Sequence, residues 1–245
     1  MRLLHLSLTI SLTSLVTLAA LSGCNHSPGN PAGLAPVSQP REITNFTELY
    51  RQNCSGCHGE DGNGGAAIAV ENETYLAIAD NATIRRVTSN GVPGTSMPAF
   101  AETSGGMLTD AQIGIIVKGI RERGKLSRLA GVVPPSYAAK LPGDPNHGAE
   151  VYGTFCSSCH GPDGRGTAKA SSIVDPSFLA LASDQYLRTI VIAGRPELGA
   201  PDWRGNAAGT PMSETDVSDV VAWLSAQRTK AVLHGNAGNS YPGAK

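Results

Sequence analysis

The sequence CSGCHG at residues 54–59 recurs as CSSCHG at residues 156–161, 102 residues further along a chain of 245. A glycine-rich loop follows each copy, DGNG at residues 61–64 and DGRG at residues 163–166. Self-similarity at a fixed offset indicates repeated structural units. We therefore expect two copies of one module rather than a single large domain.

The two halves also share a helical pattern after these motifs. Residues 83–90 and 184–193 each form a short amphipathic stretch that ends at a glycine. A capping box then begins an amphipathic closing helix at residues 109–112 and again at residues 213–216. The second box has Asp216 where Glu or Gln is usual. Neither half shows a convincing alternating strand pattern, so the sequence predicts two all-α modules.

The C-x-x-C-H motif is the attachment signature of c-type haem. Two thiols at this spacing can both add to the vinyl groups on one edge of a porphyrin, and the adjacent histidine can turn onto the iron. C-x-x-C alone also occurs in thioredoxin-like pairs and in zinc sites, but the added histidine in both copies favours haem. The sequence thus predicts two covalent c haems, attached through Cys54, Cys57, Cys156 and Cys159, with His58 and His160 as axial ligands.

Composition agrees with small modules built around a prosthetic group. Aromatic residues make up only 5% of the chain, so two cores of ordinary size would be thin without a large apolar body such as a porphyrin. The formal net charge is -1 and no long basic run occurs, which excludes a nucleic-acid-binding function.

Each half resembles a small bacterial class I cytochrome c, and the pair resembles the di-haem cytochromes c of periplasmic respiratory chains. The resemblance covers residues 43–125 and 143–229. It implies two helical domains, each wrapped around one covalent haem, and an electron carrier rather than an enzyme. The partners that it implies are redox proteins, namely an oxidase, a reductase or another respiratory complex of which the chain could be a subunit.

In this family the sixth iron ligand is usually a methionine in a Met-Pro loop. The first half has that loop in GVPGTSMPAF at residues 91–100, where Met97 stands 39 residues after His58. The resemblance therefore makes Met97 the sixth ligand of the first haem. Thioether ligation raises a haem's reduction potential.

The second half departs from this pattern, because Ala200 stands where the first loop has Met97. The only methionine of that half is Met212, 52 residues after His160, and we take it as the expected ligand. It aligns with Leu108, so a hydrophobic staple before the capping box is the alternative. An open or water-ligated iron, His234 and His147 are the further alternatives; an open iron would suit a peroxidase-like enzyme.

Two further expectations come from the family. The histidine Nδ1–H is received there by a proline carbonyl, for which Pro176 is the match, whereas Glu73 stands at that place in the first half. The family also packs a glycine of the first helix against an aromatic residue of the last. The second half keeps this arrangement with Gly148 and Trp223, and the first inverts it with Phe46 and Gly119.

The N-terminal residues have the pattern of an export signal. Arg2 precedes an apolar stretch at residues 3–21, and the segment ends in LSGC at residues 21–24, which resembles a bacterial lipobox. In lipoproteins the signal, here residues 1–23, is removed and the new N-terminal cysteine carries acyl chains. An uncleaved transmembrane helix is the alternative. We expect export and anchoring at the periplasmic side of a membrane through Cys24.

Composition also sets the boundaries between these parts. Proline- and glycine-rich segments lie on either side of the first module, and a glycine-containing segment ends the chain. The expected segments are a lipid-anchor cysteine and tether at 24–42, a linker at 126–142 and a flexible tail at 230–245.

Overall fold

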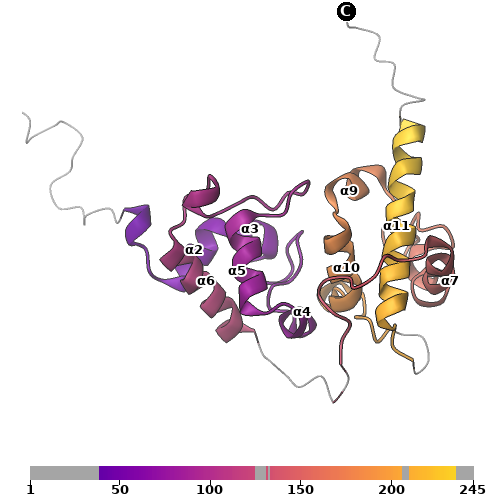
Figure 1. Ribbon diagram of the computed structural model, residues 1–245, viewed down its shortest axis with the longest axis horizontal. Coiled ribbons are helices and arrows are strands. Elements are labelled where there is room, and N and C mark those ends of the chain that lie inside the picture. Colours follow the sequence, from indigo (N-terminus) through magenta and orange to yellow (C-terminus); the bar gives the residue numbers. More distant parts are fainter. Residues whose placement is uncertain (1–38, 125–130, 132, 206–209, 236–245) are drawn as a thin grey trace, which may run out of the picture. The chain divides into compact units, whose positions relative to one another are not determined.

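A computed structural model describes residues 39–124, 131, 133–205 and 210–235, with side chains up to residue 228 (Figure 1). Both helical modules belong to one unit, Arg41–Lys245. The expected signal segment and Cys24 lie outside the described residues. Among the described helices, none is long and apolar enough to cross a membrane.

The first module begins each of its main helices with a side-chain cap. The side chain of Asn45 accepts from the backbone of Glu48, and Asn72, Asp80 and Thr109 do the same at the starts of later helices. Such caps satisfy amides that a helix start leaves without a partner. The elements are η2 (Pro40–Glu42), α2 (Phe46–Asn53), α3 (Ser55–His58), α4 (Glu73–Ile78), α5 (Asn81–Asn90), η3 (Glu102–Ser104) and α6 (Asp110–Arg123).

The second module repeats this order. Its elements are α7 (Pro145–Phe155), α8 (Ser157–His160), α9 (Pro176–Leu181), α10 (Asp184–Ala193), η4 (Pro196–Leu198) and α11 (Glu214–Gly235). Within the described residues, strand-like pairing is limited to two isolated bridges, Ala101 with Leu108 and Arg195 with Ala200. The predicted all-α fold in two tandem modules is confirmed.

Both predicted capping boxes are present. At the start of α6, the Gln112 amide donates to the Thr109 hydroxyl at 3.2 Å and the Thr109 amide to the Gln112 side chain at 3.0 Å. At the start of α11, Asp216 and Ser213 exchange the same two bonds at 3.1 and 2.8 Å. Asp216 therefore replaces the usual Glu or Gln without loss of the box.

The opening and closing helices of each module lie in direct contact. In the second module a Cβ atom at Gly148 would lie 2.0 Å from the carbonyl oxygen of Asp219 and 2.9 Å from the Cβ of Trp223. In the first module the glycine is Gly119 on the closing helix, and Phe46 of the opening helix lies against it. The predicted inversion of large and small residues is confirmed.

Two expected boundaries differ from the structure. Part of the predicted linker is fixed on the second module, because Arg188 donates to the Ser136 carbonyl at 2.9 Å and Gln185 to the Tyr137 carbonyl at 2.7 Å. Polar side chains that reach back from α10 thus hold a proline-rich segment that has no helix of its own. Helix α11 also runs to Gly235, into the predicted tail.

Candidate haem sites

Each C-x-x-C-H motif forms a tight helical turn that directly follows the opening helix. Cys54 ends α2 and precedes the four-residue helix α3, which Gly59 terminates with a φ of 83°. A Cβ atom at Gly59 would lie 1.7 Å from the carbonyl oxygen of Asn63. Only glycine fits this close, left-handed position, so the chain can reverse directly behind the histidine. Gly161 has the equivalent φ of 80°.

A tyrosine holds the end of each turn, and sequence reasoning missed both. The Tyr50 hydroxyl donates to the Gly59 carbonyl at 3.2 Å, and the Tyr152 hydroxyl donates to the Gly161 carbonyl. Burial raises the pKa of both phenols, that of Tyr152 to about 12, so both remain protonated donors. The signal was a tyrosine four residues before the first cysteine in each half.

The two histidine rings are oriented by backbone carbonyls. The Nδ1 atom of His58 lies 2.7 Å from the carbonyl oxygen of Ile68, and that of His160 lies 2.8 Å from the carbonyl oxygen of Ser171. An Nδ1–H in this bond leaves Nε2 free to bind a metal. Burial lowers the pKa of His58 despite its bond to Ile68, and the charge of Arg195 lowers it further, which favours the neutral, ligating form.

The expectation that the Pro176 carbonyl accepts the hydrogen bond of His160 Nδ1 is therefore wrong. Pro176 is the first residue of α9, as Glu73 is the first residue of α4, and each lies five residues beyond the actual partner. The glycine-rich loops fold back onto the motifs before these helices begin, through bonds such as the Gly166 amide to the His160 carbonyl at 2.8 Å. Because the loop folds back in this way, the Ser171 carbonyl, and not that of Pro176, lies next to the His160 ring.

The four motif cysteines are free, and their chemistry disfavours a redox dithiol. Burial and the neighbouring Cys57 raise the pKa of Cys54 to about 12, and burial and Cys159 raise that of Cys156 to about 11. Thioredoxin-like pairs instead have a cysteine with a lowered pKa. Each turn offers two free thiols and one oriented imidazole, the donor set that covalent haem c requires.

The loop that contains Met97 is held by its own backbone. The Val92 amide donates to the Met97 carbonyl at 3.0 Å, and the Met97 amide donates to the Thr95 hydroxyl at 3.2 Å. Gly91 begins the loop with a φ of 66°, and a Cβ atom there would lie 2.6 Å from the Met97 carbonyl oxygen. Met97 is half-buried in this loop.

The equivalent loop of the second module confirms the alignment with Ala200. The Arg195 amide donates to the Ala200 carbonyl at 3.0 Å, as Val92 does to Met97. A Cβ atom at Gly194 would meet Pro201, the residue after Ala200. This loop therefore carries no sulfur at the position that Met97 has in the first module.

Met212 lies in the apolar core of the second module. It is buried in a cluster with Trp203, Val217 and other apolar residues. The Met212 amide donates to the Trp203 carbonyl at 2.8 Å, as the Leu108 amide does to the Phe100 carbonyl at 2.8 Å. Met212 thus takes the place that Leu108 has in the first module, which favours the staple over the iron ligand.

The two histidine alternatives lie elsewhere. Nδ1 of His147 lies 2.7 Å from a carboxylate oxygen of the buried Asp219, at the contact of α7 with α11. His234 belongs to α11, but its side chain lies outside the described residues.

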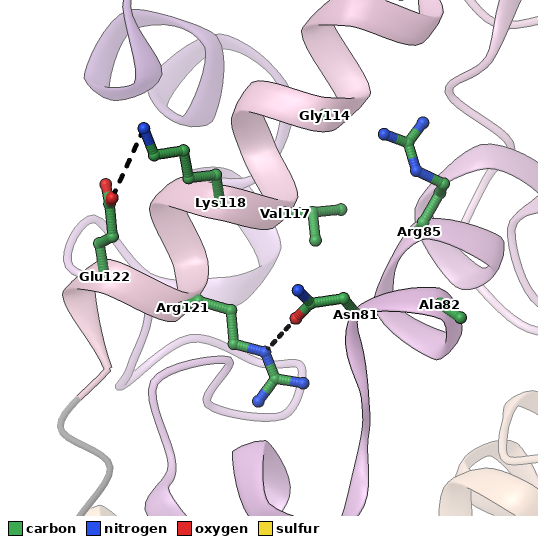
Figure 2. A pocket seen from close by; sticks show the side chains of 8 residues that line it. All are labelled: Asn81, Ala82, Arg85, Gly114, Val117, Lys118, Arg121 and Glu122. Atoms are coloured by element: carbon green, nitrogen blue, oxygen red, sulfur yellow. Dashed lines mark hydrogen bonds and ion pairs between the residues drawn. The ribbon is translucent and has the colours of Figure 1, made fainter.

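An open pocket of about 610 Å³ lies between α5 and α6 of the first module (Figure 2). Its cations already have partners: Lys118 lies 3.7 Å from Glu122, and Arg85 lies 2.6 Å from Asp110. Arg121 binds the Asn81 side chain at 2.7 Å. The lining residues are Asn81, Ala82, Arg85, Gly114, Val117, Lys118, Arg121 and Glu122.

The Arg121 guanidinium also binds the carbonyls of Leu76 and Ala79, which end α4. Arg228 does the same for α9, at 3.0 Å to the Leu179 carbonyl and 2.7 Å to the Ala182 carbonyl. A cation at a helix C-terminus satisfies carbonyls that the helix leaves without partners. Arg121, which lines the pocket of Figure 2, therefore connects α6 with the end of α4.

Comparison with known proteins decides the family. The model of cytochrome c oxidase, cbb3-type, subunit III matches residues 41–118 and 143–224, which together exceed half of the chain and coincide with the two modules. The chain belongs to this family. The chain is thus a tandem cytochrome c protein with two covalently bound c haems.

Two curated relatives are subunits of cbb3-type cytochrome c oxidases. FixP of Sinorhizobium medicae (strain WSM419) is 26% identical over 187 residues, covering 68% of this chain and 58% of FixP. FixPc of Rhizobium leguminosarum bv. viciae is 25% identical over 191 residues, covering 71% of this chain and 59% of FixPc. The chain therefore spans about three fifths of the length of these relatives.

Among solved structures, the chain resembles the reducing HAO-like protein complex Kustc0457/Kustc0458 of Kuenenia stuttgartiensis. The identity is 18%, the match covers 78% of this chain and 99% of that one, and the TM-score is 0.45. A likeness this loose carries no argument about function.

Proposed function

We propose that this chain is an electron-transfer protein of the respiratory chain, which passes single electrons between redox protein partners, one of them a cbb3-type oxidase. The observation that carries the proposal is the pair of complete C-x-x-C-H turns, each with its histidine Nδ1 on a backbone carbonyl. The relatives' membership of oxidase complexes supports the choice of partner.

The residues of each turn have distinct parts in this function. Bound haem supplies a one-electron iron couple. Cys54 and Cys57 would hold the first haem through thioether bonds, and His58 Nε2 and Met97 would be its axial ligands. Two hydrogen bonds fix this turn in one geometry, that of the Tyr50 hydroxyl to the Gly59 carbonyl and that of His58 Nδ1 to the Ile68 carbonyl. A site that is fixed in this way needs little rearrangement when its charge changes.

Two measurements test the proposal. The protein, matured in a host that attaches c-type haem, should contain two acid-stable haems per chain, and C54S/C57S and C156S/C159S variants should each retain one. The reduced protein should then be reoxidised faster by a purified cbb3-type oxidase than by hydrogen peroxide. Rapid peroxide turnover without oxidation by the oxidase would overturn it.

We propose further that the protein is exported and anchored at the periplasmic side of a membrane by acylation of Cys24. The lipobox-like LSGC at residues 21–24 supports this proposal. Intact mass spectrometry of the membrane-bound form should give a chain that begins at Cys24 and carries two haems and lipid. A C24S variant should become soluble or accumulate as a precursor with both haems intact; a C24S variant that still fractionates as processed membrane protein would contradict the proposal.

Ala200 favours a second candidate function, at the second haem alone. No sulfur stands at the loop position there, and Met212 lies in the core. The second iron would then be open to a small ligand, as in a peroxidase-like enzyme. Carbon monoxide should bind one of the two ferrous haems of the unmodified protein, and hydrogen peroxide should be consumed with a reduced partner as electron donor. Two haems that both resist carbon monoxide would exclude this function.

A further inference from the structure

The second module's counterpart of the Met97 loop contacts the first module. We call residues 193–202 the docking loop. The Asn72 side chain donates to the Ala193 carbonyl at 3.1 Å, and the Thr74 hydroxyl donates to Asp202 at 3.2 Å. Ala193, the last residue of α10, is also 1% exposed within the first module's apolar cluster. Both polar and apolar contacts therefore hold the docking loop against the first module.

Arg195 of the docking loop binds two backbone carbonyls of the first module. Its Nη2 lies 2.6 Å from the Gly65 carbonyl oxygen, and its Nη1 lies 3.4 Å from the Ala66 carbonyl oxygen. Its Nε binds Glu197 at 2.5 Å, and the side chains of this ion pair are only 11% and 19% exposed. A largely buried guanidinium is stable only when its donors are satisfied. Here the bonds to the first module satisfy them.

The carbonyl that Arg195 holds belongs to a residue lying on the first haem-binding turn. A Cβ atom at Gly65 would lie 2.2 Å from the carbonyl oxygen of Cys57, 2.5 Å from the Gly59 amide nitrogen and 2.7 Å from the carbonyl carbon of His58. Gly65 therefore packs directly on the backbone of the motif. Through its bond to Gly65, the Arg195 guanidinium therefore restrains the turn of the first C-x-x-C-H motif.

The Met97 loop and the docking loop differ at two equivalent positions. Val92 and Met97 in the first loop correspond to Arg195 and Ala200 in the second, and each pair shares the same backbone bond. We propose that the docking loop has exchanged iron ligation for contact with the first module, and that Arg195 is the positioning residue that fixes the first haem-binding turn and raises the first haem's reduction potential. This inference rests on the proposed electron-transfer function only in requiring that both haems bind.

Removing the charge of Arg195 and removing the charge of Glu197 should shift the first haem's reduction potential in opposite directions. A cation near the first haem stabilises the reduced iron, which has one positive charge fewer than the oxidised iron. Loss of Arg195 also leaves Glu197 unneutralised, and an anion favours the oxidised iron. R195Q should therefore lower the first haem's potential, E197Q should raise it, and the double variant should return it close to the wild-type value.

Redox titration of the complete two-haem protein, followed optically, tests these signs. The first haem is identified by the potential that Met97→Ala shifts. In R195Q the reduction equilibrium constant of that haem should fall about threefold to tenfold, where tenfold is about 59 mV for a one-electron couple. R195K keeps the charge and should stay near the wild type. Arg165→Gln is the matched control, because Arg165 is an exposed arginine of the second module paired with Asp163.

Hydrogen exchange supplies a readout that does not depend on electron transfer. Amides of residues 59–67 should exchange faster in R195Q, and also in R195Q/E197Q, since both lose the bonds to Gly65 and Ala66. An unchanged potential of the first haem in R195Q, or a shift confined to the second haem, would overturn the proposal. Failure of the oxidase to accept electrons would instead count against the proposed function and leave both of these readouts intact.

Discussion

A Cβ atom at Gly119 would lie 2.1 Å from Cδ2 of Phe46, so the ring of the opening helix rests on the backbone of the closing helix. The second module reverses the sizes, with Gly148 on α7 and Trp223 on α11, and the Trp223 ring stacks on Tyr152 at 4.2 Å. The same helix crossing is thus filled from opposite sides in the two modules. One large and one small residue are needed at each crossing, whichever helix supplies them.

Gly119→Trp should overpack the first module, because Phe46 already fills the space above the glycine. We expect a loss of about 1–3 kcal/mol in the free energy of unfolding. Phe46→Gly alone should also destabilise, since the ring packs between Gly119 and the Arg123 guanidinium, 4.9 Å from its centroid. The double variant should lose less than the sum of the two single variants, and denaturant unfolding of all four proteins measures this coupling.

The control for this crossing is Gly153, a glycine of the opening helix α7 with no heavy atom within 4 Å of a built Cβ. Gly153→Ala should stabilise the helix by about 0.5–1 kcal/mol, because alanine loses less backbone entropy there. Gly119→Ala should destabilise instead. Strict additivity of the Phe46 and Gly119 variants would show that the two residues do not interact.

Much of this fold could be predicted because local signals and a repeat agree. The C-x-x-C-H turns, the two capping boxes and the helices that end at Gly91 and Gly194 all depend on residues close together in sequence. The crossing of Phe46 with Gly119 could be inferred by counting from the motif, since helix geometry is regular. Within a regular helix, a fixed number of residues corresponds to a fixed position along the helix.

The remaining features depend on loops, where offsets are not regular. The carbonyls on the histidine rings come from Ile68 and Ser171, which are placed by glycine-rich loops that bond back to the motifs. The sequence alone does not show how many residues after the motif such a loop folds back to the histidine. Contacts between modules, such as Arg195 with Gly65, were likewise invisible, because no periodicity relates residues 130 positions apart.

Arg121 and Arg228 should be equivalent stabilising residues in the two modules. Each guanidinium binds two carbonyls at the end of a six-residue helix, α4 or α9. Arg228→Met keeps much of the apolar stem but removes these bonds, so it should lower the free energy of unfolding by about 1–2 kcal/mol. The loss is kept small because the guanidinium is partly exposed to solvent. Arg121→Met should cost a similar amount. Thermal unfolding of both variants checks this.

The control for the helix-end arginines is Arg165, whose side chain is 81% exposed and pairs with Asp163 on a loop. Arg165→Met should change stability by less than about 0.5 kcal/mol, as is usual for exposed ion pairs. Equal effects of Arg165→Met and Arg228→Met would show that the two helix-end carbonyls contribute nothing.

His147 should make the stability of the second module depend on pH. Its Nδ1 lies 2.7 Å from buried Asp219, and this hydrogen bond raises the pKa of His147, as do the charges of Asp216 and Glu150. A raised pKa means that the folded state binds the proton more tightly. The stabilisation is therefore fully present below the ordinary histidine pKa of about 6.5 and is lost as pH rises through the raised value.

A His147→Gln variant tests that sign, because glutamine can donate to Asp219 at any pH. The wild type should exceed the variant in melting temperature by the largest margin near pH 5, and the margin should shrink steadily toward pH 9. Circular dichroism of the helices at each pH gives the melting temperatures. A margin that stays constant, or that grows in alkali, would show that His147 is not the titrating group.

Met97 and Met212 should respond in opposite ways to the same substitution. Met97 lies half-buried in a loop, whereas Met212 is buried with Trp203 and Val217 at the place of Leu108. Met97→Ala should therefore open the first haem to carbon monoxide and lower its potential, since a sulfur ligand that favours ferrous iron is lost. Met212→Ala should leave both haem spectra unchanged and cost about 2–5 kcal/mol, as usual for a methionine removed from a core.

Three optical states separate this expectation from its alternatives. With Met212 in the core, the ferrous wild type binds carbon monoxide at one haem, Met97→Ala binds it at both, and Met212→Ala behaves as the wild type. Met212→Leu, which keeps the volume and copies Leu108, should restore most of the lost stability without changing any spectrum. If Met212 were instead the sixth ligand, the wild type would resist carbon monoxide at both haems, and Met212→Leu would open the second as fully as Met212→Ala. Two low-spin haems that survive both Met212 substitutions would point to a nitrogen ligand such as His234.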